Sequence, residues 1–274
     1  MDTAAVTASA ILFALVGLAL GSFVNVLVPR WAAGESIGGR SRCPRCRRTL
    51  AARDLIPIVS FVALRGRCRR CHQPIPRRYP LVELGTAAVL AVTALHVGLA
   101  PALFVYAPLA VFLVALFVFD WQHQLVPDEL SLPAAGLALV GNLFLGLSFS
   151  SLLLGGILGA GFFALQYVVS RGRWVGDGDI RLGLLAGFAL GFERTIVALV
   201  LAYVVGALVG VALLARGRVT LSSHLPFGML VTAATFVSLL WGDAIIAWYM
   251  SGAFFRGLGL DAIAEWFISR RHGL

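Results

Sequence analysis

Long apolar runs separated by short polar links fill most of this 274-residue chain. Several runs reach the roughly 20 consecutive apolar residues that a helix needs to cross the hydrocarbon core of a bilayer. The pattern therefore predicts an all-α polytopic membrane protein with about eight transmembrane helices. The predicted helices occupy residues 4–28, 80–98, 102–119, 130–147, 151–169, 180–192, 196–215 and 225–241.

Both ends of the chain and one short run need separate interpretation. The first transmembrane helix, residues 1–29, follows no basic n-region and has no cleavage-site pattern, so we expect it to be retained. The run 180–192 is short for a crossing of its own. After Trp241, the segment 243–274 mixes aromatic, aliphatic and charged residues, which predicts an interfacial C-terminal helix.

The composition indicates that the chain lies in lipid, and the distribution of charge indicates its orientation in the membrane. Hydrophobic residues make up 59% of the sequence and charged residues 13%, so we expect the lipid bilayer to surround most of it. Most of the arginines lie between Arg30 and Arg78, opposed there only by Glu35 and Asp54. Such a cluster can bind nucleic acid, but between membrane helices the positive-inside rule is the commoner cause. We therefore expect a cytoplasmic loop and no nucleic-acid partner.

This orientation has a consequence for the acidic residues. The other loops on the cytoplasmic side are then 119–130, 170–180 and 216–224. Arg194, in an outward loop, is the exception to the charge bias among the loops. Asp120 closes the third predicted helix and Asp179 opens the sixth, so both lie at cytoplasmic helix ends. At one membrane depth, the two carboxylates could meet in one pocket.

All four cysteines lie in the basic loop 30–79, as the pairs CPRC and CRRC. Two CxxC pairs supply four thiolates for a tetrahedral Zn²⁺, and neighbouring arginines favour the thiolate forms. Four thiolates leave no open coordination position, so the zinc should organise the loop rather than catalyse. Two disulfides are the alternative, although reducing conditions in the cytoplasm disfavour them. The predicted ligands are Cys43, Cys46, Cys68 and Cys71.

Four aspartates near helix ends have different local roles. Asp128 follows a proline at a helix start, where an acid caps the helix and suits its dipole. Asp120 stands at a helix C-terminus, where an acid opposes the dipole, and this favours a functional role. In GDGD, we expect Asp179 to be desolvated at the start of an apolar helix and Asp177 to be more hydrated.

Asp120 and Asp179 together suit aspartyl proteolysis. One ionised carboxylate can deprotonate water while its protonated partner polarises the scissile carbonyl, because proximity and low dielectric separate the two pKa values. A simple capping role for Asp179 is the alternative.

The chain resembles the bacterial type IV prepilin peptidases, membrane aspartyl proteases that also act as N-methyltransferases. The likeness runs from GSFVNVLVPR at 21–30 to LLWGD at 239–243. In order, it includes the two CxxC pairs, DLIPIVSF, LRGRCRRCHQPIPRRYPLVEL, FDWQHQLVPDELSLP, GDGDIRL and LPFG. Arg181 stands where the family usually has lysine, and Met229 where proline is common.

The resemblance implies an activity and its site. Asp120 and Asp179 would be the catalytic pair that removes the basic leader from type IV prepilins or pseudopilins at the cytoplasmic face of the inner membrane. S-adenosylmethionine would then supply a methyl group for the new N-terminus. The residues that bind it are unknown from sequence, with Glu83 a weak candidate.

The resemblance also divides the chain. Residues 1–29 form the first helix, 30–79 the zinc loop, 80–242 the peptidase bundle and 243–274 the interfacial segment. Two other classes of function stay open at this point. One is a proton-coupled transporter that uses the same aspartates. The other is a zinc-loop membrane scaffold without catalysis.

Overall fold

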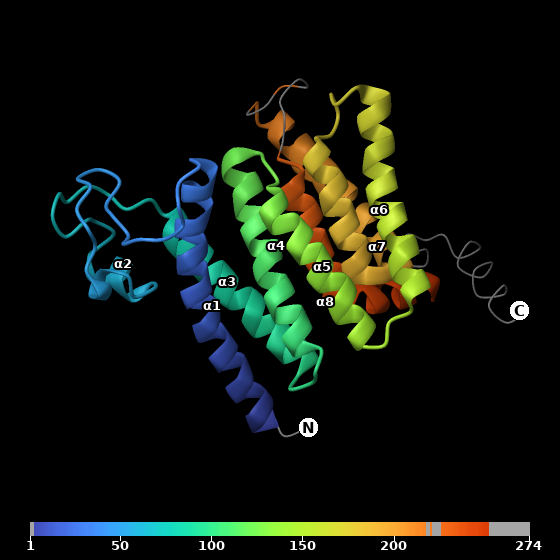
Figure 1. Cartoon of the computed structure of the whole chain (residues 1–274), viewed down its shortest axis with the longest axis horizontal. Coiled ribbons are helices and arrows are strands. Elements are labelled where there is room, and N and C mark those ends of the chain that lie inside the picture. Colours follow the sequence, from blue (N-terminus) through green and yellow to red (C-terminus); the bar gives the residue numbers. More distant parts are fainter. Residues whose placement is uncertain (1–2, 218–219, 221–225, 252–274) are drawn as a thin grey trace, which may run out of the picture. The chain divides into compact units, whose positions relative to one another are not determined.

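A computed structural model describes residues 3–217, 220 and 226–251 (Figure 1). Its described residues form helices and loops without a strand, apart from two isolated bridges in the cysteine loop. The elements are α1 (Thr3–Ala32), the 3₁₀ turn η1 (Ala52–Asp54), α2 (Val59–Ala63), α3 (Arg78–Val97), α4 (Leu103–His123), α5 (Asp128–Phe144), α6 (Phe149–Ser170), α7 (Asp177–Ala215) and α8 (Gly228–Met250).

Membrane-spanning helices dominate the described part of the chain. Six of its helices, α1, α3, α4, α6, α7 and α8, are long and apolar enough to cross a bilayer. This confirms the prediction of an all-α multi-pass membrane protein. The number eight stays a prediction, because α5 has only 17 residues and α7 has 39. A straight helix as long as α7 would measure about 58 Å, twice what one crossing needs.

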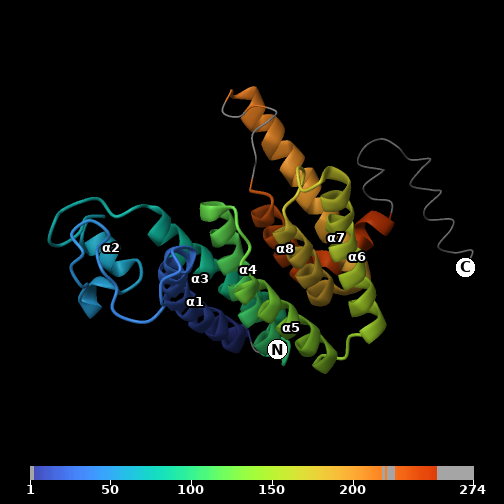
Figure 2. The same cartoon turned by 45° about the horizontal axis from the view of Figure 1, so that its top comes forward.

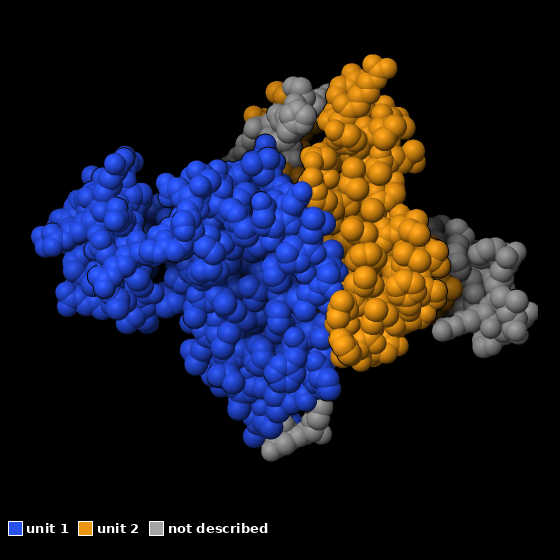
Figure 3. Space-filling view, viewed as in Figure 1, with its two compact units in different colours: residues 1–137 blue, residues 138–274 orange. Residues whose placement is uncertain are grey.

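The chain divides into two compact units, residues 1–137 and 138–274, shown in different colours in Figure 3. In the first unit α1 packs along α3, as Figures 1 and 2 show. The helices approach closely where α1 carries glycine: a Cβ at Gly17 would lie 2.6 Å from the Cα of Ala87, and one at Gly21 2.8 Å from that of Glu83. Small residues spaced by four are a common way for membrane helices to pack.

Side chains of α1 fix the two ends of the cysteine loop. The Asn25 amide donates a hydrogen bond to the carbonyl of Tyr79 across the α1–α3 contact, at 3.0 Å. At the end of α1, the Arg30 guanidinium donates to the carbonyls of Ile37 and Gly38, at 2.8 and 2.7 Å. Hydrogen bonds therefore fix the loop both where it follows α1 and where it leads into α3.

In the second unit, α7 is two helices rather than one. Gly191 has a φ of 72°, a left-handed value that is open to glycine and interrupts the helix. The first part, 177–190, and the second, 192–215, meet at this residue. The sequence predicts separate helices at 180–192 and 196–215. The break confirms that there are two helices, but it lies at Gly191, before the link expected at 193–195, whose residues are helical.

Side chains of neighbouring helices satisfy the backbone groups that the break exposes. The Asn142 amide of α5 donates to the carbonyls of Phe188 and Ala189, both at 2.9 Å. The Ser151 hydroxyl of α6 accepts the N–H of Phe192 at 3.1 Å. These bonds matter because lipid offers no partner to a free backbone group.

Contacts with α6 show that the two parts of α7 run in opposite directions. The first part advances along 183–187 while its contacts move back along α6 from Gly159 to Gly155. The second part starts beside the beginning of α6, and by Tyr203 it has reached Gln166 near the end, where the Tyr203 hydroxyl donates at 2.7 Å. The element is therefore a helical hairpin that reverses at Gly191.

The last described helix is longer than the sequence pattern indicates. α8 continues past Trp241 and ends at Met250, so the apolar patch AIIAWYM belongs to it. The interfacial helix predicted within 243–274 falls mostly at 252–274, outside the described residues.

An ion pair joins the hairpin to α8. The Arg194 guanidinium donates through two nitrogens to the two carboxylate oxygens of Asp243, one at 2.6 Å. Gly242 makes room, because a Cβ there would lie 3.0 Å from the Arg194 side chain. Arg194, the exception to the charge bias, is thus neutralised by an acid on the neighbouring helix. It therefore counts less against the predicted membrane orientation.

The glycine contact between α6 and α7 gives a stability prediction. A Cβ at Gly159 would lie 2.2 Å from the carbonyl oxygen of Gly183, so Gly159→Ala should cost about 1–3 kcal/mol through overpacking. The matched control Gly161→Ala lies in the same helix with no heavy atom within 4 Å. It should be neutral or stabilise by up to about 1 kcal/mol, because alanine favours helix. Thermal unfolding in detergent, followed by near-UV circular dichroism, compares the variants; equal midpoints would contradict the packing.

Candidate active site and four-cysteine centre

The first CxxC pair forms a tight hairpin. The N–H of Cys43 donates to the carbonyl of Arg48 at 3.0 Å, and the N–H of Arg47 donates back to the carbonyl of Cys43 at 2.8 Å. Arg47 has a φ of 53°, which turns the chain immediately after Cys46. The turn brings the two thiols of the pair to the same side.

The second pair repeats this geometry. The N–H of Cys68 donates to the carbonyl of Gln73 at 2.9 Å, and the N–H of His72 donates to the carbonyl of Cys68 at 3.0 Å. His72, like its counterpart in the first hairpin, has a left-handed φ, here 57°. The loop thus contains two equivalent knuckles, and the thiols of each face those of the other.

The two knuckles bring all four sulfurs together. Their Sγ atoms lie within 4.8 Å of one another, and those of Cys43 and Cys71 are 3.8 Å apart. Four sulfurs at about 2.3 Å from a tetrahedral zinc would be about 3.8 Å apart, whereas a disulfide needs about 2 Å. All four are unbridged thiols. The arrangement fits a metal centre, and the disulfide alternative is wrong.

The two thiols of the second knuckle differ in pKa because their surroundings differ. Backbone N–H donors at Cys71 and Arg70 lower the pKa of Cys68 to about 7. For Cys71, the N–H of Gln73 favours the thiolate, but desolvation and the neighbouring thiols outweigh it and raise the pKa to about 11. Four thiolates so close together repel one another, so a bound cation is needed to deprotonate the whole set.

Asp179 is held at the start of α7. It is the third residue of that helix, and its carboxylate accepts the N–H of Gly176 at 3.0 Å. The side chain is buried, whereas Asp177 is 68% exposed and pairs with Arg181 at 3.0 Å. The contrast expected within GDGD is therefore confirmed. The capping bond and a catalytic role are compatible, because a carboxylate has further lone pairs to offer.

Asp120 is buried in the last turn of α4. The helix ends at His123. The next residue, Gln124, has a left-handed φ of 52°, and its N–H donates to the carbonyl of Asp120 at 2.9 Å. A buried acid near a helix C-terminus loses hydration and opposes the dipole, so stability does not explain its position. Asp128 differs, since it is exposed in the first turn of α5, as expected for a helix-start acid.

An aromatic cluster near Asp179 gave no signal in the sequence. The ring of Tyr203 lies 5.5 Å from Phe162 and 4.9 Å from Phe227, measured between centroids. The neighbouring ring of Phe163 lies against Gly183, one helical turn after Asp179. Phe163 completes the cluster at 6.1 Å from Phe227. These residues come from three separate helices or their ends, so only the fold reveals the group.

Comparisons with known proteins now identify the family. The bacterial Peptidase A24 N-terminal domain matches residues 15–97, and the type IV leader peptidase family matches residues 107–211. The chain is 34% identical to the prepilin leader peptidase/N-methyltransferase of Pseudomonas aeruginosa, over 88% of this chain and 93% of that protein. The chain belongs to the type IV leader peptidase family.

Relatives outside Pseudomonas give the same result for this leader peptidase family member. It is 35% identical to the Bacillus subtilis protein of the same name, over 86% of this chain and 96% of that protein. No solved structure matches the chain. The family is one of proteases, so the chain is an enzyme, and the transporter and scaffold interpretations have no support.

The family matches separate the two candidate centres. All four cysteines lie within the N-terminal match, and both Asp120 and Asp179 lie within the leader peptidase match. Asp120 belongs to the first compact unit and Asp179 to the second. Their pairing in one site therefore stays a prediction.

The sulfur geometry predicts one metal ion per chain. Replacing Cys43 and Cys46 with serine should remove it, because two remaining thiolates cannot complete a tetrahedral site. The matched control is Ser41→Ala together with Thr49→Ala, in the same hairpin outside the ligand set. Elemental analysis of purified protein reads the metal content, and limited proteolysis reads the order of the loop. Unchanged metal content in the double serine variant would contradict the assignment.

Proposed function

We propose that this protein is a membrane aspartyl endopeptidase that removes the basic leader from type IV prepilins or pseudopilins. Methylation of the new N-terminus would follow. The main support is the match to prepilin leader peptidase/N-methyltransferases over most of the chain. The burial of Asp120 and Asp179, each at the end of an apolar helix, adds chemical support.

The proposed mechanism uses the two aspartates as a general acid–base pair. One carboxylate, ionised, takes a proton from water, and the hydroxide equivalent attacks the carbonyl carbon of the scissile peptide. The other carboxyl, protonated, donates a hydrogen bond to the carbonyl oxygen as negative charge develops there. Collapse of the tetrahedral intermediate breaks the C–N bond, and the leaving amine receives the proton taken from water. The bond of Asp179 to the N–H of Gly176 would hold that carboxylate in place.

The metal in the four-cysteine centre is zinc in this proposal. Four thiolates at tetrahedral spacing are a common structural zinc site, and they leave no position for water or substrate. Its contribution would be to hold the two knuckles together. Exposed arginines adjoin both cysteine pairs in the sequence, and their positive charge would favour a centre of net negative charge.

S-adenosylmethionine would supply the methyl group, but no described residue is assigned to bind it. Glu83, the weak candidate from sequence, accepts the N–H of Ile58 at 2.8 Å and is buried in the α1–α3 contact. That arrangement fits a structural contact with the loop better than a methyl-donor site.

Substituting the acids tests the peptidase. Asp179→Asn and Asp120→Asn should each lower leader cleavage by about 100- to 10,000-fold, because an amide cannot exchange a proton with water. The control variants Asp177→Asn and Asp128→Asn replace exposed acids and should keep most of the activity. Mass spectrometry of a co-expressed prepilin reads both leader loss and methylation. Cleavage retained in Asp179→Asn, or a dead Asp128→Asn beside an active Asp120→Asn, would remove the proposed dyad.

The proposed site faces the cytoplasm, and labelling tests this orientation. Added cysteines at the exposed residues Ser150 and Glu193 should react with an impermeant thiol reagent applied from outside the membrane. A cysteine at exposed Trp174 should resist it until the membrane is permeabilised. The protein without an added cysteine, labelled in parallel before and after permeabilisation, gives the background from the four native cysteines. Reaction of Trp174 and Ser150 from the same side would refute the topology.

A further inference from the structure

The cysteine loop carries an apolar stripe that no other described part of the protein covers. The loop segment 55–63, between the two knuckles, places Ile56, Val59 and Val62 three residues apart, with 48, 60 and 66% of each residue exposed. Val59 and Val62 lie three residues apart in α2 and therefore share a side of this short helix, and Ile56 lies in the turn just before it. Exposing these apolar side chains to water would cost free energy, so we expect another molecule to cover them.

A hydrogen bond to α3 sets the depth of this segment. The Glu83 carboxylate accepts the N–H of Ile58 at 2.8 Å, and Glu83 is buried. It lies five residues inside α3, which begins at Arg78, so it is about 7 Å along the helix axis. The 20 residues of α3 measure about 30 Å, the thickness of the hydrocarbon core. Ile58 therefore lies level with the membrane end of α3 rather than out in the aqueous phase.

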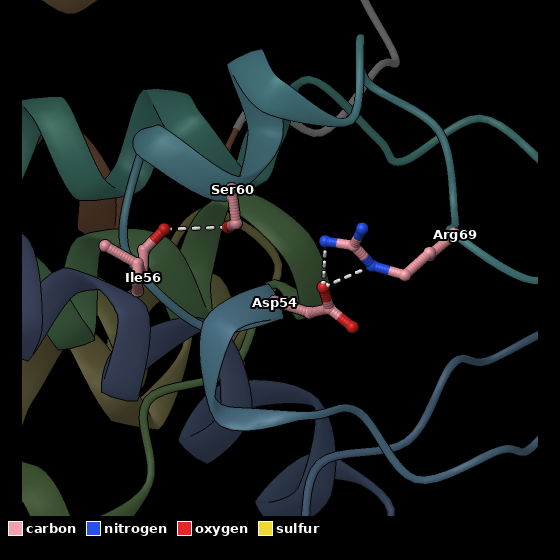
Figure 4. Close-up of polar contacts among 4 residues, drawn as sticks. All are labelled: Asp54, Ile56, Ser60 and Arg69. Carbon is pink, nitrogen blue, oxygen red and sulfur yellow. Dashed lines mark hydrogen bonds and ion pairs between the residues drawn. The ribbon is translucent and has the colours of Figure 1, made fainter.

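The backbone of the segment is suited to that position. Ser60 donates its N–H and its hydroxyl to the carbonyl of Ile56, at 3.0 and 2.7 Å, and the hydroxyl bond is drawn in Figure 4. Val62 donates to Ile58 at 3.0 Å, and Ile58 has a left-handed φ of 61° that turns its own N–H toward Glu83. Polar backbone groups bonded internally are what a segment in contact with lipid requires.

Charge around the stripe is strongly positive. Arg53 precedes the segment and Arg65 follows it, both exposed, and the second knuckle adds further arginines. The nearby acid Asp54 is occupied: its carboxylate accepts two bonds from Arg69, at 2.8 and 2.9 Å (Figure 4). That pair also ties the segment to the knuckle. The remaining guanidinium groups match the phosphates of an anionic membrane surface.

We propose that loop segment 55–63 is a wedge inserted into the membrane interface, with an anionic phospholipid bilayer as its partner. Ile56, Val59 and Val62 contact acyl chains, while Arg53 and Arg65 bind headgroup phosphates. The loop is anchored in the bilayer by α1 on one side and α3 on the other, so lipid is always within reach. The wedge holds the four-cysteine centre at a fixed height above the membrane, and this role does not depend on the peptidase mechanism.

Photocrosslinking in the full-length protein identifies the partner directly. Val62→benzoylphenylalanine is placed at an exposed residue, and Thr49→benzoylphenylalanine, exposed on the first knuckle, is the matched control. Both are reconstituted in nanodiscs containing phosphatidylglycerol, with and without a prepilin. Mass spectrometry after irradiation should show severalfold more phospholipid adduct at Val62 than at Thr49. Adducts at Val62 to a second copy or to prepilin, or no excess of lipid adduct, would overturn the proposal.

A second comparison tests the arginines. Arg53→Gln combined with Arg65→Gln, in the Val62 probe background, should lower the lipid adduct severalfold in phosphatidylglycerol nanodiscs. In phosphatidylcholine nanodiscs the same change should have little effect, because there the net headgroup charge is zero. An equal effect in both lipids, or none in either, would show that headgroup charge does not hold the wedge. Leader cleavage, measured in parallel, separates this result from the fate of the proposed function.

Discussion

The lack of hydrogen-bonding partners in lipid is the constraint on which this structure depends. Every backbone N–H and C=O group at membrane depth must find its partner within the protein. Where α7 breaks at Gly191, Asn142 and Ser151 take up backbone groups near the break. Where the cysteine loop meets α3, Glu83 takes up the N–H of Ile58. Irregular backbone is therefore found where a neighbouring helix already provides a partner.

The same constraint explains how glycine is used. A helix pair in lipid gains little from burying apolar surface, so stability comes from close contact between backbones. In the second unit, Gly155 and Gly159 of α6 meet Gly187 and Gly183 of α7 at distances that leave no room for a Cβ. This contact holds the first part of α7 against α6 and so fixes the helix whose third residue is Asp179. Packing far from the carboxylate thereby decides where the carboxylate lies.

The two cysteine knuckles are stabilised differently, because arginines and exposed residues surround them in the sequence. Its two knuckles are local hairpins, each closed by hydrogen bonds within a few residues. Only the meeting of the hairpins requires long-range contact, and four thiols in one place need a cation to be deprotonated together. A metal bound to the four thiols would, together with the salt bridge between Asp54 and Arg69, stabilise a loop that is too small for a hydrophobic core of its own.

Features that depend on residues close together in the chain could be predicted from the sequence. Apolar runs predicted the helices, CxxC pairs predicted the metal ligands, and a glycine-flanked Asp177 could be distinguished from a desolvated Asp179. Contacts between residues far apart in the chain became known only from the fold. They are the bond of Glu83 to the cysteine loop, the ion pair of Arg194 with Asp243, and the packing of the aromatic rings on one another. Hydropathy predicts which segments prefer lipid to water, but it carries no information about hydrogen-bond or packing partners on another helix. For that reason a break between two helices was predicted at 193–195, close to its actual place at Gly191, while the side chains that satisfy the backbone there were not.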